Sequence, residues 1–418
     1  MTQLSDDCFA FGGVLMSGAE ALRLIEARTV ALPEPETVPL ARARDRILAS
    51  PVVAARDVPP HDNAAVDGYA VFFDDLAPGA ETILPIEGRA TAGHPLDRAA
   101  RRGAAIRIFT GAPMPDGPDT VFMQEDCRED GGQVRLPEGL KRGANRRRAG
   151  EDVRAGATVL SAGLRLRPQE IGLAASLGRT ELTVYRRLRV ALLSTGDEVR
   201  EPGAPLPSGA IYDANRYTLR ALLEGLGAEV TDLGILPDER SAIQSALGRA
   251  AESHDLIVSS GGMSTGEEDH MKAAVEAQGR LHFWRLAIKP GRPVAMGQVG
   301  RVPFLGLPGN PVAVMVTFLV LARPLILRLA GATDIAPRSF RAVSGFAYRK
   351  KPGRRKYLRA RLEPGSDGVW VAQKFPRDGA GILTSMVDSD GLVVLEEATT
   401  DIAPGASVPF LPFREVID

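Results

Sequence analysis

Residues 259–270, with the sequence SSGGMSTGEEDH, combine a small-residue loop with three consecutive carboxylates. The loop precedes a helical pattern that begins at Met271, and backbone N–H groups at a helix N-terminus favour anions. Glu267, Glu268 and Asp269 would repel the same anion. Two interpretations stay open: the acids stabilise the helix N-terminus, or they hold Mg²⁺, which in turn binds phosphate oxygens.

The segment LLSTGDE, residues 192–198, repeats this pattern of a strand, a small-residue turn and two acids. By itself it is typical of a solvated turn. When two strands of one sheet both end in small residues and carboxylates, a shared site for a metal and a phosphate becomes the better interpretation, because ligands of parallel sheets bind outside the carboxyl ends of the strands.

Two further turns carry candidate binding groups. Lys289 and Arg292 flank a Pro-Gly turn in LAIKPGRP, where they either neutralise a phosphate or oxyanion or are simply exposed bases. The turn GLPGNP, residues 306–311, is explained by rigidity alone, and Pro311 is suited to the first position of a helix.

These motifs need a sheet that brings strand ends together, and the middle of the chain predicts one. Strand-like runs alternate with helical patterns at the spacing of βαβ units, so we expect a parallel sheet covered on both faces. The expected strands are residues 190–194, 230–235, 256–260 and 302–307, and the expected helices are residues 215–226, 239–253, 269–278 and 312–329.

The regions before and after this sheet differ in character. Ser17 and Glu20 form a capping-box pattern at the start of a helix over residues 17–31, and a second helix is expected over residues 165–177. Residues 36–156 contain short apolar runs between Gly, Pro and Asp, which is typical of an all-β region with long loops. Its segment DNAAVDGYA, residues 62–70, predicts a hairpin. Short alternating runs after residue 331 predict a small terminal β domain.

Composition excludes several classes of protein. The chain has 418 residues with a formal net charge of −1, which gives no global field for nucleic acid or an anionic membrane. Its two cysteines, Cys8 and Cys127, favour a reducing cytoplasm. The first residues lack a signal-peptide pattern. The most apolar segment, residues 311–321, is followed by Arg323 and Pro324 and predicts a buried helix rather than a membrane span.

The ordered set of motifs resembles the molybdopterin molybdenumtransferases, which are themselves similar to the C-terminal domain of gephyrin. The set consists of DNAAVDGYA, TGAPMP, VFMQED, RRRAGEDV, STGDEV, IYDAN, SSGGMSTGEEDH, FWRLAIKPGRP and GLPGNP. Any one of these motifs is weak, but nine in the same order are specific. The resemblance runs from about residue 17 to the C-terminus.

The resemblance implies a reaction, a cofactor and an assembly. Molybdate is inserted into adenylylated molybdopterin, AMP is released, and Mg²⁺ is the expected metal. It implies a cytoplasmic homodimer in which the β-rich domain of one subunit covers the α/β domain of the other. The expected partners are other molybdenum-cofactor biosynthesis proteins, and binding to nucleic acid or to a membrane is not expected.

The resemblance also implies a multidomain α+β and α/β fold of four domains. Residues 1–34 join 157–187 in an N-terminal linker and dimer domain, into which a β-rich domain, 35–156, is inserted. Residues 188–330 form the molybdopterin-binding α/β domain, and residues 331–418 form a small barrel-like β domain.

The site residues implied by resemblance fall into three groups. Those with catalytic roles are Asp67, Thr110, Arg147, Asp152, Glu198, Asp238 and Asp269. The metal ligands are Asp269, Glu198 and Asp238. The substrate-binding residues are Ser260, Gly261, Gly262, Ser264, Gly266, Arg285, Lys289, Pro308, Pro311 and Arg359.

Three positions depart from the family's pattern. Arg285 stands where Lys is common, Ala64 replaces a usual Ser, and Ala380 in RDGAGILTSM replaces a Ser of the proposed molybdate pocket, where Ser385 or backbone amides are candidate substitutes. Two alternatives remain beside the transferase. A gephyrin-like scaffold would keep the fold without the activity, and a molybdopterin adenylyltransferase would resemble the α/β domain alone and consume ATP.

Overall fold

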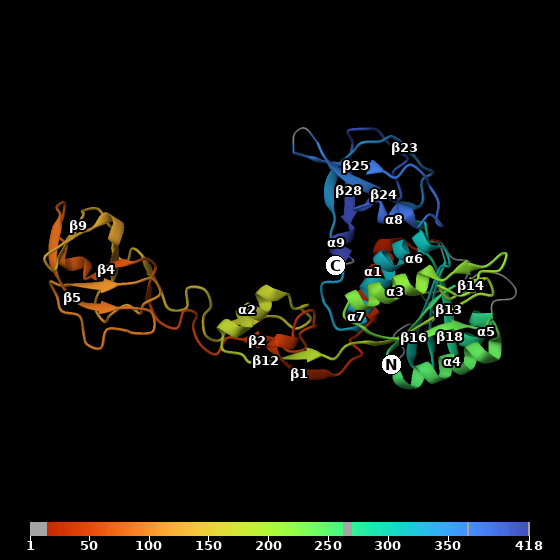
Figure 1. Ribbon diagram of the computed structural model, residues 1–418, viewed down its shortest axis with the longest axis horizontal. Helices are drawn as coiled ribbons and strands as arrows, with labels where there is room; N and C mark the ends of the chain where they lie inside the picture. Colours follow the sequence, from red (N-terminus) through yellow and green to blue (C-terminus); the bar gives the residue numbers. More distant parts are fainter. Residues whose placement is uncertain (1–14, 262–269, 292, 366–367, 417–418) are drawn as a thin grey trace. The chain divides into compact units, whose positions relative to one another are not determined.

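The computed structural model describes residues 15–261, 270–291, 293–365 and 368–416. The chain divides into two compact units. The first unit comprises the chain up to Ser50, Ala162–Arg167 and Glu181–Asp418, and the second comprises Pro51–Ser161 and Pro168–Thr180. The first unit contains the α/β sheet and the C-terminal β domain, and the second contains the β-rich region (Figure 1).

A six-stranded sheet forms the centre of the first unit. Four of its strands are parallel neighbours, and two antiparallel strands extend it at one edge. The parallel strands are the four that the sequence predicts, whereas the antiparallel pair was not predicted. In spatial order the strands are β16 (Glu229–Leu236), β13 (Arg189–Thr195), β17 (Leu256–Ser260), β21 (Val302–Leu307), β20 (Pro293–Val299) and β18 (Gly279–Arg285).

Helices cover both faces of this sheet, as Figure 1 shows. Successive side chains of a strand point to opposite faces, and β13 shows the consequence: Leu192 packs in one core cluster, while Ala191 and Leu193 pack in the other. One face carries α3 (Ala214–Gly225), α6 (Pro311–Thr317) and α7 (Arg323–Leu329), and the other carries α4 (Arg240–Ser253) and α5 (His270–Glu276).

The apolar segment that follows β21 is a core helix. It runs through α6, a π-helical turn over Phe318–Ala322, and α7. Within the described part of the chain, Pro311–Leu329 is the one helix long and apolar enough to cross a membrane, but 78% of that window is buried inside the protein. The prediction of a buried helix is confirmed, and Pro311 opens it as expected.

The first helix packs against this core helix. α1 (Gly18–Arg28) begins with the predicted capping box, in which Ser17 and Glu20 exchange hydrogen bonds. Arg328 of α7 donates from Nε to the carbonyl of Thr29 at 3.1 Å. β1 (Pro35–Pro39) then pairs antiparallel with β12 (Glu181–Tyr185), so the chain leaves and re-enters the first unit on paired strands.

The second unit is built on another six-stranded sheet. Its strands in spatial order are β7 (Thr120–Met123), β4 (Gly68–Val71), β6 (Ala105–Ile108), β5 (Thr82–Ala90), β9 (Gln133–Leu136) and β8 (Arg128–Asp130). Short pairs add β2 (Val52–Val53) to β11 (Thr158–Leu160) and β3 (Asn63–Ala64) to β10 (Arg146–Arg147), and α2 spans Pro168–Ser176. The predicted hairpin within residues 62–70 is wrong, because β3 and β4 each pair with strands elsewhere in the chain.

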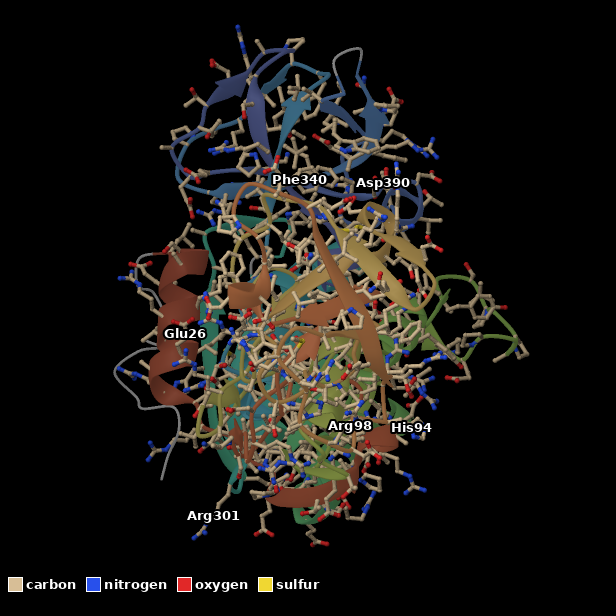
Figure 2. The ribbon with its side chains drawn as sticks, turned by 90° about the vertical axis from the view of Figure 1, so that its left-hand side faces the viewer. Glu26, His94, Arg98, Arg301, Phe340 and Asp390 are labelled. Atoms are coloured by element: carbon tan, nitrogen blue, oxygen red, sulfur yellow. The ribbon has the colours of Figure 1, made fainter. Side chains whose placement is uncertain are left out.

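The C-terminal strands close into a barrel. β24 (Arg355–Pro364), β25 (Trp370–Lys374), β22 (Phe340–Ser344), β28 (Ser407–Pro412) and β26 (Gly391–Leu395) pair in this order, and β26 pairs back with β24. Two residues labelled in Figure 2 belong to it: the Phe340 ring lies 5.5 Å from that of Phe410, and the Asp390 carboxylate accepts from the Leu362 N–H at 2.8 Å.

Short elements complete the chain. They are β14 (Val199–Arg200), β15 (Ile211–Tyr212), β19 (Ile288–Lys289), β23 (Tyr348–Arg349), β27 (Asp401–Ile402), α8 (Thr384–Val387), α9 (Phe413–Val416) and the 3₁₀ turns Leu40–Arg42, Phe73–Asp75 and Gln124–Asp126. The predicted fold class is confirmed: a β-rich region, a central α/β sheet and a barrel-like C-terminal domain. The boundaries expected for four domains stay a prediction.

Gly391 tests the closure of the barrel. A Cβ at this position would lie 2.3 Å from the carbonyl oxygen of Leu411 and 2.6 Å from the ring of Phe410, so Gly391→Ala must displace backbone. We expect a loss of about 1–3 kcal/mol in the free energy of unfolding, as for other overpacked cores. Calorimetric unfolding measures it, with Gly381→Ala as the control because no atom lies within 4 Å of its Cβ. Equal transitions for the two variants would contradict this account.

Candidate active site

The carboxyl ends of β13 and β17 form a hollow with the first turns of α3 and α6. It brings together four residues that the sequence assigns to the site, namely Glu198, Ser260, Gly261 and Pro311. The other lining residues are Ser194, Thr195, Val199, Ile211, Tyr212, Asp213, Ala214, Asn215 and Gly309. This is the edge at which parallel sheets bind their ligands.

Small residues are required where the two strand ends approach each other. Gly261 has a φ of +81°, and a Cβ there would lie 2.7 Å from the carbonyl oxygen of Thr195. Gly196 has a φ of +141°, and its Cβ would lie 2.8 Å from a carboxylate oxygen of Glu198. A side chain at either glycine would therefore distort the wall of the hollow, which explains the glycines of both motifs locally.

Among the described residues, two hydroxyl groups in this hollow have no hydrogen-bond partner. Ser194 and Thr195 end β13, each is only 2% exposed, and the Oγ of Ser194 and the Oγ1 of Thr195 are both unpaired. Buried hydroxyls normally find a partner, so these two are suited to contact a bound ligand or water. The sequence reasoning did not single them out, although they immediately precede the Gly-Asp-Glu turn of STGDEV.

The start of α3 fixes one wall of the hollow. Asp213 accepts a hydrogen bond from the backbone N–H of Arg216 at 3.0 Å, and Asn215 donates from Nδ2 to the carbonyl of Gly309 at 2.7 Å. Burial disfavours the charge of Arg216, but hydrogen bonds to Asp232, Glu201 and Asp213 outweigh it and raise its pKa. The motif IYDAN thus ties α3 to the turn that opens α6.

Negative charge gathers beside this hollow. Asp238 follows β16 and is half-buried. Burial raises its pKa, the carboxylates of Asp197 and Glu198 raise it further, and His270 opposes them. Glu198, which follows β13, and Asp238, which follows β16, therefore lie close enough to interact electrostatically.

Several predicted residues lie outside the described part of the chain. They are Gly262, Ser264, Gly266 and Asp269, together with the candidate acids Glu267 and Glu268 and the candidate base Arg292. Among the described residues, no group of three or more His, Cys, Asp or Glu side chains is arranged to hold a metal ion. Glu198 and Asp238 supply hard oxygen donors, which is the ligand chemistry of Mg²⁺, and this ion commonly takes one or two carboxylates with substrate phosphates and water completing its shell.

Basic residues lie on the elements that join the sheet to the barrel. Arg285 ends β18, and Lys289 is an exposed residue of β19, which pairs in parallel with the start of β24 so that Lys289 lies opposite Lys356 in the register. Pro308 is buried in the turn between β21 and α6. The main-chain pairing therefore brings Lys289 to the edge of the barrel.

Arg359 is held inside the barrel by three hydrogen bonds. It is 4% exposed, and it donates from Nε to the Ser385 hydroxyl at 2.9 Å and from Nη2 to the carbonyls of Gly379 at 3.1 Å and Arg377 at 3.3 Å. Burial lowers its pKa, although Asp378 acts in the opposite direction. Ser385, a candidate substitute for the hydroxyl missing at Ala380, thus contacts Arg359 directly.

A second group of predicted residues lies in the β-rich unit. Asp67 Oδ1 accepts from the Thr110 N–H at 2.8 Å and from its hydroxyl at 2.7 Å, and these two bonds lower the pKa of Asp67. Arg147 is an exposed residue of β10 and pairs with Asn63, four residues before Asp67. Asp152 is exposed and donates its N–H to the carbonyl of Val58 at 3.0 Å.

Comparison with known proteins gives this arrangement a family. Residues 16–178 match the MoeA N-terminal region (domain I and II), residues 191–328 match a probable molybdopterin binding domain, and residues 341–413 match the MoeA C-terminal region (domain IV). A curated protein of Haemophilus influenzae named molybdopterin molybdenumtransferase is 40% identical over 91% of this chain and 95% of its own length. The chain belongs to the molybdopterin molybdenumtransferase family.

Other relatives agree with this assignment. A protein of the same name from a Nostoc species is 35% identical and covers 89% of this chain and 87% of its own length. A crystal structure of a molybdopterin biosynthesis MoeA protein from Pyrococcus horikoshii OT3 superposes with a TM-score of 0.80 at 28% identity, covering 95% of this chain and all of that one. The family that the sequence motifs suggest is confirmed.

The contact between Asp67 and Thr110 predicts a measurable shift. Thr110→Val removes the hydroxyl donor and keeps the backbone N–H, so the pKa of Asp67 should rise towards its ordinary value of 3.8 and remain below it. Because a lowered carboxylate pKa stabilises the fold above the unfolded pKa, the variant should lose less stability than wild type as the pH falls below about 4. Carboxyl-carbon NMR titration measures the shift, with Thr158→Val on β11 as the control; an unchanged Asp67 pKa would refute the contact.

Proposed function

We propose that this protein inserts molybdate into adenylylated molybdopterin and releases AMP, forming the molybdenum cofactor. The observation that carries this proposal is the hollow at the carboxyl ends of β13 and β17, in a chain 40% identical to a molybdopterin molybdenumtransferase. The hollow holds Glu198 and two buried hydroxyls that find no partner among the described residues. A transferase of this kind must bind a phosphoanhydride and an oxyanion at the same time, and the two needs are met by different groups of residues.

The hollow binds the phosphate end of the substrate. The hydroxyls of Ser194 and Thr195 donate to phosphate oxygens, and the backbone at Ser260 and Gly261 lines the same space. Glu198 and Asp238, with Asp269, hold Mg²⁺. When bound, this ion supplies positive charge to the phosphoanhydride oxygens and makes AMP a better leaving group.

The basic residues receive molybdate. Lys289 and Arg359 carry positive charge on β19 and β24, two strands that pair directly. The guanidinium of Arg359 is fixed by Ser385 and two carbonyls, so its remaining donors keep one direction when an oxyanion binds.

The active assembly is a homodimer in the cytoplasm, and other molybdenum-cofactor biosynthesis proteins supply its substrate and take its product. Asp67, Thr110, Arg147 and Asp152 of one subunit complete the site on the α/β sheet of the other. A gephyrin-like scaffold without transferase activity is not favoured, because the curated relatives that cover most of this chain carry the transferase name.

Glu198 tests the proposed chemistry. The purified protein with adenylylated molybdopterin, Mg²⁺ and molybdate should release AMP only when molybdate is present. Glu198→Gln removes one negative charge from the metal site, so we expect the Mg²⁺ concentration for half-maximal AMP release to rise about tenfold. Glu252→Gln, an exposed position on α4, is the control. Molybdate-independent release by the wild type would contradict the proposed function.

Complementation tests the shared site. Asp67→Asn alters the β-rich unit and Glu198→Gln alters the α/β sheet, so each variant alone should be impaired at both sites of its dimer. After subunit exchange at equal concentrations, mixed dimers have one intact site, and we expect recovery of about a quarter of wild-type activity for a two-fold symmetric dimer. Activity that stays at the mean of the two separate variants would show that both residues act within one chain.

A further inference from the structure

The C-terminal barrel holds two lysines that the proposed mechanism does not use. Two lysines share one carboxylate: Lys374 Nζ lies 3.1 Å from Oδ1 of Asp378, and Lys356 Nζ lies 3.6 Å from its Oδ2. Tyr348 donates its hydroxyl to the same Asp378 oxygen at 3.0 Å. We call Tyr348, Lys356, Lys374 and Asp378 the lysine pair site.

The aromatic ring orders the two ammonium groups. Lys356 Nζ lies 4.8 Å and Lys374 Nζ lies 5.8 Å from the centroid of the Tyr348 ring, both within the range of cation–π attraction. Lys356 also hydrogen-bonds the Tyr348 hydroxyl, and Lys374 donates to the carbonyl of Phe375 at 2.8 Å. The two lysines lie on neighbouring strands, β24 and β25, and their ammonium groups meet at the ring of Tyr348 and the carboxylate of Asp378.

Positive charge exceeds negative charge at this point. The side chains of Lys356 and Lys374 are only 12% and 17% exposed, and Asp378, at 49%, is far more open to water. Arg359 is buried nearby and also interacts electrostatically with Asp378, so three cations face this one carboxylate. Glu397, another acid of the barrel, is paired with Arg355 at 3.2 Å.

Such an excess is costly unless an anion offsets it. Largely buried cations need a counter-charge or several hydrogen bonds. One carboxylate against three cations leaves a formal charge of +2, which matches a tetrahedral oxyanion of charge −2 such as molybdate. Ammonium and guanidinium donors form strong, short hydrogen bonds to such an ion.

The lysine pair site also borders the residues expected to receive molybdate. β19 pairs with β24 so that Lys289 lies opposite Lys356, and Arg359 donates to the carbonyls of Arg377 and Gly379 on either side of Asp378. The loop that carries Asp378 continues to Ala380, whose carbonyl accepts from the N–H of Val312 in α6 at 2.9 Å. The same short loop thus contacts Arg359, both lysines and the helix that opens beside the hollow.

We propose that Lys356 and Lys374 form a binding subsite for the free tetrahedral oxyanion and that Asp378 occupies their ammonium groups until the oxyanion displaces it. This inference rests on the proposed function, because it assigns the oxyanion to the molybdate that the reaction consumes. Asp378 is suited to be displaced, since it lies on a loop and is half-exposed while the lysines lie on strands.

A purely structural role for the two lysines predicts the opposite effect of one substitution. If the lysines only hold the loop through Asp378, then Asp378→Asn loosens the loop and weakens any anion binding nearby. If Asp378 competes with the oxyanion, then Asp378→Asn frees both ammonium groups and strengthens oxyanion binding. The sign of this one change separates the two roles.

The test is isothermal titration of sodium molybdate into the full-length protein without adenylylated molybdopterin. Lys374→Gln and Lys356→Gln should each raise the Kd for molybdate about tenfold, the effect of losing one charged hydrogen bond. Asp378→Asn should lower the Kd severalfold, and Lys351→Gln, an exposed lysine of the same domain, should leave it unchanged. An unchanged Kd in both lysine variants, or weaker binding by Asp378→Asn, would overturn the proposal.

A second titration distinguishes the source of the anion. AMP carries a phosphate of similar shape, so if the lysines bind the substrate's phosphate, their substitution weakens AMP binding and leaves molybdate binding intact, which would also overturn the proposal. Molybdate-dependent AMP release by the wild type is measured separately. If that release occurs while the lysine variants bind molybdate normally, the subsite fails and the proposed function stands; if release is absent, the function fails whatever the lysines bind.

Discussion

The structure depends on one constraint: the central sheet is buried on both faces. β13 and β17 are buried along almost their whole length, and alternate side chains enter two separate apolar cores under helices. A polar side chain in the middle of such a strand would enter an apolar core, where it would lose its hydrogen bonds. The strand ends are therefore where Ser194, Thr195 and Ser260 can meet a ligand.

The same constraint explains why the turns after these strands are rich in glycine. Parallel neighbours end side by side, so the backbone of Gly261 lies close to that of Thr195. A Cβ at position 261 would lie 2.7 Å from the carbonyl oxygen of Thr195. Any other residue at this point would separate the two strand ends and open the wall of the hollow. Close packing of the sheet and access of the backbone to a ligand thus have the same cause.

Much of this arrangement could be predicted from the sequence because its signals are local. Alternation of strand and helix patterns identifies the four parallel strands, and Ser17 with Glu20 identifies the start of α1, since both depend on residues close together in the chain. The spacing of small residues and acids after β13 likewise predicts a polar strand end. The motif set adds the family, which the matches over residues 16–178, 191–328 and 341–413 confirm.

The features that were not predicted depend on contacts between distant segments. β18 and β20 form through pairing with each other and with β21 at the edge of the sheet. Residues 62–70 do not form a hairpin because Ala64 pairs with Arg146 and Asn63 pairs with Arg147, more than eighty residues away. The bonds of Arg359 to Ser385 and to two carbonyls also need the folded barrel. Composition and spacing carry no signal for such pairings.

Position 380 shows how a lost side chain can be tolerated. Ala380 lacks the hydroxyl found at this place in the family's pattern, but its carbonyl joins the loop to Val312, and the Ser385 hydroxyl binds Arg359 from the neighbouring helix α8. The backbone therefore fixes the loop, and a hydroxyl five residues later orients the guanidinium. Under the proposed molybdate role, charged donors then provide the main attraction for the oxyanion, namely Arg359 and the two lysines that share Asp378 with it, since charged donors bind anions more strongly than neutral ones.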